Sequence, residues 1–257
     1  MKREITTNFL SKATITLTSL LAVLIFIWPL VIGAPQQNQA GLAQGVFIVL
    51  MPLLVAMVVV EFSAGGLDSR TLAILGVLIA LNAAIRLLGA GVSGIETAFF
   101  LVILGGFVFG PSFGFLLGSG SLFLSALLAA GVGPWLPFQM MAAGLVGLGA
   151  GLLARIRNAN DLLILISYAV ISSFGYGALM TLWNWPFLAG LGSQVSYIPG
   201  APALENIIRF TRYDIFTGGL LWDLGRAVTT SVLIAISGKA LLATLRRSAN
   251  RAGFTKA

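Results

Sequence analysis

The chain is dominated by long apolar runs separated by short polar breaks. A run of about 20 apolar residues is long enough to cross the hydrocarbon core of a bilayer as a helix. The sequence predicts eight such spans, at residues 14–33, 42–61, 71–90, 97–110, 112–130, 138–154, 161–183 and 219–243. Only 9% of the residues are charged, against about 25% in ordinary soluble domains. We therefore expect an all-α, polytopic membrane helix bundle.

The pair Gly110-Pro111 decides whether the fourth and fifth runs are two spans or one kinked helix. Proline disfavours helix for the residue before it, which favours a tight turn at the membrane surface. With eight spans, one side of the membrane receives most of the basic residues: Lys2, Arg3, Lys12, Arg70, Arg155, Arg157, Arg246, Arg247, Arg251 and Lys256. The positive-inside rule then predicts a cell-membrane protein with both termini in the cytoplasm.

A short polar segment predicts how the spans are grouped. Residues 63–70, which include Gly65-Gly66, are expected to form a cytoplasmic linker. It separates a two-helix N-terminal membrane segment, 1–62, from a six-helix membrane domain, 71–257. The first run could pass for a signal peptide, but it is longer than the usual apolar region of one, which favours a retained anchor.

The remaining composition excludes several kinds of chemistry. The net charge of +7 follows from membrane topology, so no nucleic-acid partner is expected. The chain has no Cys and no His, which removes disulfides and the usual transition-metal ligands, and we predict neither a metal site nor a cofactor. Gly238-Lys239 is followed by Ala240 and lacks the upstream glycine of a phosphate-binding loop, so the chain is not expected to hydrolyse ATP by itself.

Small residues recur every four positions in several predicted spans. Ala80 and Ala84 share one face of the third span, and the same interval links Gly106, Gly110, Gly114 and Gly118, then Ala143, Gly147 and Gly151. Such faces let helix backbones approach closely in lipid. Internal packing of the bundle is the commoner use of this pattern, and docking of a partner is the alternative.

Residues 70–245 resemble the substrate-binding S component of an energy-coupling factor (ECF) vitamin transporter. The likeness rests on four segments: Ala80-Leu-Asn-Ala-Ala84, Phe109-Gly-Pro-Ser-Phe-Gly-Phe-Leu-Leu-Gly118, Gly133-Pro-Trp-Leu-Pro-Phe-Gln139 and Trp222-Asp-Leu-Gly-Arg226. The resemblance implies that Ala80 and Ala84 dock on a transmembrane coupling subunit, and that two ATPase subunits energise uptake of a vitamin-like solute. The 131–139 segment is similar to that of members assigned to cobalamin or related ligands. The two N-terminal spans depart from the usual six-helix S component.

Charges and aromatic residues at the outer ends of the spans suggest where a solute binds. Arg226 precedes Arg246 by 20 residues, about 30 Å of helix, which puts the two residues at opposite membrane surfaces. The segment 184–218 is predicted to be a long outer loop, a common place for functional residues. The candidate substrate-binding residues are Arg86, Trp135, Gln139, Trp183, Asn184, Tyr197, Arg209, Arg212, Asp223 and Arg226.

Each candidate also has a purely structural interpretation. The tryptophans fit an aromatic belt at the interface, Asp223 and Arg226 fit an internal ion pair, and Arg86 fits a side chain that reaches to headgroups. Arg209 and Arg212, with Glu205, fit the solvated face of a short amphipathic helix, and Asn82 fits an interhelical hydrogen bond. For the whole chain, the alternatives to a binding subunit are an intramembrane lipid-modifying enzyme and a structural membrane protein without a ligand.

Overall fold

The computed structural model describes residues 16–17, 20, 23–31, 69–89, 95–154, 160–188, 193–217 and 219–253. Their regular structure is helical throughout, with no strand among the described residues. Five of the described helices are long and apolar enough to cross a membrane. These findings confirm the predicted all-α polytopic bundle. The predicted span 42–61, eight of the 20 residues of the span 14–33 and six of the eight residues of the linker 63–70 lie outside the described residues.

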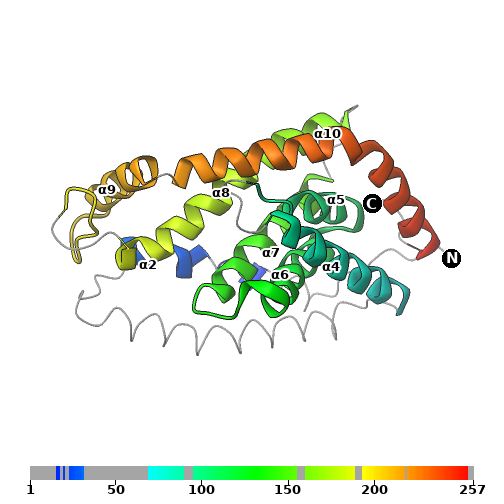
Figure 1. Cartoon of the computed structure of the whole chain (residues 1–257), viewed down its shortest axis with the longest axis horizontal. Helices are drawn as coiled ribbons and strands as arrows, with labels where there is room; N and C mark the ends of the chain where they lie inside the picture. Colours follow the sequence, from blue (N-terminus) through cyan, green and yellow to red (C-terminus); the bar gives the residue numbers. More distant parts are fainter. Residues whose placement is uncertain are drawn as a thin grey trace.

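The body of the molecule consists of six packed helices (Figure 1). They are α4 (Ser69–Gly89), α5 (Phe99–Phe109), α6 (Pro111–Ser125), α7 (Leu136–Leu153), α8 (Asp161–Leu188) and α10 (Gly219–Arg251). A π-helical turn, Ala126–Ala130, extends α6. The short helices α2 (Trp28–Val31) and α9 (Ala203–Phe216) lie at one end of the elongated body, beside the end of α8.

Gly110 separates α5 from α6, as the turn prediction required. Its φ of 98° is one that L side chains rarely adopt, and Pro111 follows as the first residue of α6. Phe109 and Phe113 stack across the turn with ring centroids 4.4 Å apart. However, α5 has only 11 residues, about 16 Å of helix. The helix within the predicted span 97–110 is therefore shorter than a typical membrane-spanning helix, and protein surrounds it along nearly its whole length.

Glycines set the spacing of α5, α6 and α7. A Cβ added to Gly114 would collide with the backbone of Gly147, and a Cβ on Gly147 would collide with the backbone of Gly114. A Cβ on Gly106 or Gly118 would likewise strike the backbone of α7. The four-residue interval of small residues in these helices therefore packs the bundle internally, which is the commoner of the two uses expected from the sequence.

The helices α8 and α10 run antiparallel and mark the two ends of the bundle. At one end, Asp161 at the start of α8 pairs with Arg246 near the end of α10. Arg70 at the start of α4 donates to the backbone carbonyl of Arg251, 3.4 Å away, at the same end. Asp223 and the end of α4 lie toward the opposite end, as the spacing of Arg226 and Arg246 predicted.

Much of the described part of the predicted outer loop 184–218 is helical. Residues 184–188 continue α8 through Pro186, and residues 203–216 form α9. The sequence does not reveal the extension of α8, since Trp, Asn and Pro next to the membrane surface are typical of interfacial loops as well as of helix ends. The expectation of a short amphipathic helix around Arg209 and Arg212 is confirmed by α9.

Candidate functional site: a buried polar cluster

An ion pair on α10 lies inside the bundle, in contact with α8. Asp223 Oδ1 accepts a hydrogen bond from Arg226 Nη1 at 2.5 Å, and the two side chains are only 4% and 11% exposed. The same Nη1 donates to the Ser173 carbonyl at 3.2 Å. Gly177 leaves the space that the Asp223 carboxylate occupies, since a Cβ there would overlap that carboxylate. The contact surface of α8 thus accommodates the ion pair that α10 carries.

The Arg226 guanidinium also lies against two aromatic rings. Its Cζ is 4.8 Å from the ring centroid of Tyr176 and 5.7 Å from that of Phe99, distances at which cation–π attraction operates. The two rings meet edge to face at 4.7 Å. Arg226 is therefore fixed in orientation by a carboxylate, a carbonyl and two rings, rather than reaching out to solvent.

A second basic residue enters the bundle from α4. Arg86 Nη1 donates to Ser125 Oγ on α6 at 2.8 Å, and Arg86 Nε lies 3.8 Å from Glu96 Oε1. Glu96 in turn accepts a hydrogen bond from the backbone N–H of Ala98, at the start of α5. Arg86 is thus tied to protein groups, which disfavours its interpretation as a side chain that reaches to lipid headgroups.

The two ion pairs belong to one cluster. Arg226 lies over the ring of Phe99, and Ala98, the residue before Phe99, donates its backbone N–H to Glu96, the partner of Arg86. Each arginine is matched by one carboxylate, so the paired groups carry no net formal charge.

Several polar groups around these pairs have no hydrogen-bond partner among the described residues. They include both side-chain polar atoms of Asn82 and the hydroxyls of Ser121, Ser173 and Thr230. Asn82 and Ser121 each precede a member of the Arg86–Ser125 hydrogen bond by four residues, and Thr230 follows Arg226 by four. Residues four apart share a helix face, so these groups lie on the faces that carry the ion pairs. We use the name polar cluster for Asn82, Arg86, Glu96, Ser121, Ser125, Ser173, Tyr176, Asp223, Arg226 and Thr230.

Trp183 and Tyr197, two other predicted site residues, lie in aromatic packing. Trp183 is 4% exposed and stacks on Phe138, with ring centroids 4.0 Å apart, and its indole N–H has no partner among the described residues. Tyr197 is 2% exposed and meets Trp185 edge to face at 5.5 Å. Trp183 is seven residues after Tyr176, on the same face of α8 and toward the end of the helix. Asn184, next to Trp183, is half-buried.

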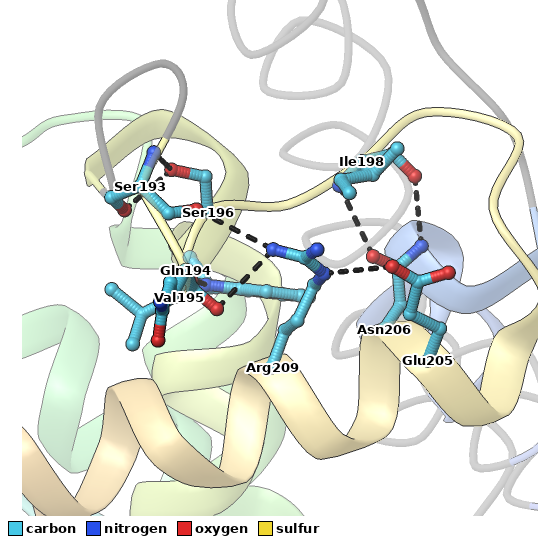
Figure 2. Close-up of polar contacts among 9 residues, drawn as sticks. Ser193, Gln194, Val195, Ser196, Ile198, Glu205, Asn206 and Arg209 are labelled. Carbon is cyan, nitrogen blue, oxygen red and sulfur yellow. Dashed lines mark hydrogen bonds and ion pairs between the residues drawn. The ribbon is translucent and has the colours of Figure 1, made fainter.

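Arg209 and Asn206 of α9 hold the segment 193–198 (Figure 2). Arg209 donates to the carbonyls of Gln194 and Ser193, at 3.2 and 3.4 Å, and to Glu205 at 3.1 Å. Asn206 exchanges two hydrogen bonds with the backbone of Ile198, at 2.9 and 3.1 Å. Arg209 therefore stabilises this segment, while Arg212, one turn away, is exposed.

The other predicted residues lie at the surface. Trp135 is 43% exposed just before α7, which suits an interfacial tryptophan, and Gln139 is half-buried on the first turn of α7. Ala80 and Ala84 are both exposed on α4. Nearby Gly76 has nothing within 4 Å of its Cβ position, so this face of α4 meets no other described residue there.

Paired ionisable side chains inside a bundle of apolar helices are often found along substrate or ion pathways in membrane proteins. The sequence model of the family described as ECF transporter, substrate-specific component, matches residues 70–245, which is more than half of the 257-residue chain. The chain therefore belongs to this family. Neither a curated protein nor a solved structure matches it.

Membership of this family confirms the resemblance seen in the sequence. It makes the chain a substrate-binding membrane subunit of an ECF importer, that is, a transport subunit. It also implies interaction with coupling and ATPase subunits and with a small-molecule substrate. No group of His, Cys, Asp and Glu side chains that could hold a metal ion occurs in the described part of the chain.

Sequence reasoning found three of the four charged members of the cluster, Arg86, Asp223 and Arg226, but neither Glu96 nor the neutral members. Ser121, Ser173, Tyr176 and Thr230 were not candidates, and Asn82 was interpreted as an interhelical hydrogen bond, for which the described residues offer no partner. A usable signal was present. Polar residues stand four apart in three predicted spans, at Asn82 and Arg86, at Ser121 and Ser125, and at Arg226 and Thr230.

Proposed function

We propose that this subunit captures a vitamin-like solute from outside the cell and holds it at the polar cluster. The observation that carries the proposal is the set of buried side-chain groups without partners on α4, α6, α8 and α10. A buried polar group without a hydrogen bond costs about 1–3 kcal/mol. A bound solute that supplies the missing donors and acceptors offsets this cost, which explains why such groups persist in an apolar bundle.

The charge balance of the cluster favours a solute that is uncharged where it meets these residues. Arg86 faces Glu96 and Arg226 faces Asp223, so a charged group would have to compete with an existing ion pair. The cluster groups without a hydrogen-bond partner in the described ranges are the amide of Asn82, the hydroxyls of Ser121, Ser173 and Thr230, and the Nε atoms of Arg86 and Arg226. Such groups recognise carbonyl, amide and heterocyclic nitrogen groups, with Tyr176 and Phe99 supplying flat apolar contacts. A cobalamin-related ligand, suggested by the 131–139 segment, carries amides of this kind.

The remaining candidates are proposed to surround the route to this cluster. Trp183 and Asn184 lie two turns beyond Tyr176 on α8, and the indole N–H of Trp183 is without a partner among the described residues. Trp135 and Gln139 lie at the start of α7. Tyr197, Arg209 and Arg212 would act through the segment 193–198 and α9 rather than at the cluster itself.

Solute retention tests the binding proposal. We expect the purified wild-type protein to carry a small molecule that mass spectrometry detects after denaturation, and Asn82→Leu to lose it, because leucine fills the position without hydrogen-bonding groups. Ile171→Leu, on the exposed face of α8, is the matched control and should retain it. Equal retention by wild type and Asn82→Leu would contradict the assignment of the cluster.

We further propose that the exposed face of α4 around Ala80 and Ala84 docks on the coupling subunit, with two ATPase subunits supplying the energy. Ala84→Leu is expected to abolish uptake and co-purification with the coupling subunit while leaving solute retention intact. Ile236→Trp adds bulk to an exposed position of α10 and serves as the control. Loss of solute retention in Ala84→Leu would contradict a pure docking role. This proposal places both termini in the cytoplasm, with Arg70 and Arg246.

A further inference from the structure

The helix α9 has an apolar stripe on the side that faces away from the protein. Asn206 and Tyr213 are 2% and 9% exposed and form its packed side. Leu204, Ile208 and Ile215 are 69%, 47% and 50% exposed. Their spacing places the three side chains in one line on the opposite side of the helix. The line runs over about 16 Å, at 1.5 Å per residue.

This arrangement is unsuited to a helix that faces water. A surface helix normally packs its apolar side on the protein and turns its polar side to solvent, whereas α9 also turns leucine and isoleucine outward. Its partners within the described residues are already on the other side, where Asn206 and Arg209 hold the segment 193–198 (Figure 2). The outward stripe is therefore a surface for something other than the described part of this chain.

Further exposed apolar side chains lie where α9 meets α10. Phe216, Leu221 and Trp222, at the junction of α9 with α10, are 81%, 71% and 50% exposed. They lead into the exposed apolar side of α10, one of the five helices long and apolar enough to cross a membrane. Figure 1 shows α9 beyond the first residues of α10, at the end of the bundle. Exposed apolar side chains next to a helix that is long and apolar enough to span a membrane are most simply covered by the same lipid.

Arg212 provides the polar contact expected at a membrane surface. It is exposed, beside the stripe, and pairs with no carboxylate in the described ranges, whereas Arg209 is occupied by Glu205 and two carbonyls. A basic residue at the edge of an apolar helical stripe interacts favourably with lipid phosphates. The exposed apolar stripe and the exposed Arg212 of α9 are thus both suited to contact with a lipid surface.

We propose that α9 lies along the membrane interface at the polar-cluster end of the bundle, with Leu204, Ile208 and Ile215 among the acyl chains. The lipid then anchors α9, and through Arg209 and Asn206 it also fixes the segment 193–198. This inference is independent of the solute, so its test stands or fails separately from the proposed function.

Single-cysteine labelling tests the location of α9, because the chain contains no cysteine of its own. Spin labels would be attached at Ile208→Cys and Ile215→Cys, in protein reconstituted at high lipid-to-protein ratio into phosphatidylcholine–phosphatidylglycerol vesicles. Collisions with oxygen, which concentrates in lipid, are compared with collisions with a water-soluble nickel chelate. Ile236→Cys on α10 is the lipid-facing reference, and Gln194→Cys is the water-facing reference.

We expect the labels at both α9 positions to favour oxygen over nickel, as at Ile236, and the label at Gln194 to show the opposite preference. A preference for nickel at Ile208 and Ile215 would place the stripe in water and overturn the proposal. Protection from both reagents would also overturn it, since the stripe would then be covered by protein, either another segment of this chain or a second copy.

Discussion

The Asp223–Arg226 pair offers the sharpest quantitative prediction. Because the two side chains are 4% and 11% exposed, the small energies typical of surface ion pairs do not apply. Asp223→Leu would leave the Arg226 guanidinium buried with only the Ser173 carbonyl and two rings as neighbours. We expect this to lower the free energy of unfolding by about 3–5 kcal/mol. Arg226→Met leaves Asp223 unpaired and should cost a similar amount.

The double variant Asp223→Leu/Arg226→Met separates the pair from its members. With both charges removed, apolar side chains fill the site, and we expect the double variant to lose less stability than either single variant. The assay is reversible unfolding in mixed micelles by added sodium dodecyl sulfate, followed through tryptophan fluorescence. If the two single losses simply add in the double variant, the side chains do not interact and the reasoning about this pair is refuted.

Two further predictions concern packing and pH. Gly147→Ala places a methyl group against the Gly114 backbone and should lower the free energy of unfolding by about 1–3 kcal/mol. The control Gly175→Ala, with nothing within 4 Å of the added Cβ, should not destabilise the protein. Equal losses of unfolding free energy in the two variants would contradict the proposed glycine packing. Burial raises the pKa of Asp214, against a hydrogen bond from Thr181 that lowers it. The folded state therefore disfavours the charged form of Asp214, and stability is lost as the carboxyl group ionises. Protection of α9 from hydrogen exchange should fall as the pH rises from the ordinary aspartate pKa of the unfolded state through the raised pKa of the folded state. Asp214→Asn should remove this dependence, and an unchanged pH profile in that variant would count against the assignment.

The sequence predicted most of the bundle because its main determinant is local. Apolar length alone located α4, α7 and α10 to within a few residues at their starts, and Gly110-Pro111 located the turn between α5 and α6. Apolar length could not show that α5 is a short buried helix, because a fully apolar run looks the same whether lipid or protein surrounds it. It also could not show that α8 continues to Leu188.

The candidate site was only partly predictable, for a different reason. The charged residues Arg86, Asp223 and Arg226 stand out in an apolar chain, and the structure places them in one cluster with Glu96. Serine and threonine do not stand out, because their hydroxyls commonly donate to the carbonyl one turn earlier, as Ser237 does to Leu233.

The aromatic residues could not be assigned from the sequence for another reason. Tyr197 and Trp183 each carry one polar group on an aromatic ring, which is typical of side chains that line a ligand pocket. The same side chains also pack well against other aromatic rings in a protein core. Which of these uses applies depends on neighbours distant in sequence, such as Phe138 beside Trp183.

The claim that the polar cluster holds the solute is tested most directly by Thr230→Val, with solute retention and unfolding free energy measured on the same preparation. Valine has the shape of threonine without its hydroxyl, which is buried and without a partner in the described ranges. The account predicts unchanged or higher stability of the solute-free protein together with solute affinity lower by about tenfold, the equivalent of about 1.4 kcal/mol. Lower stability with unchanged solute affinity would show that the hydroxyl serves the fold, and would contradict the account.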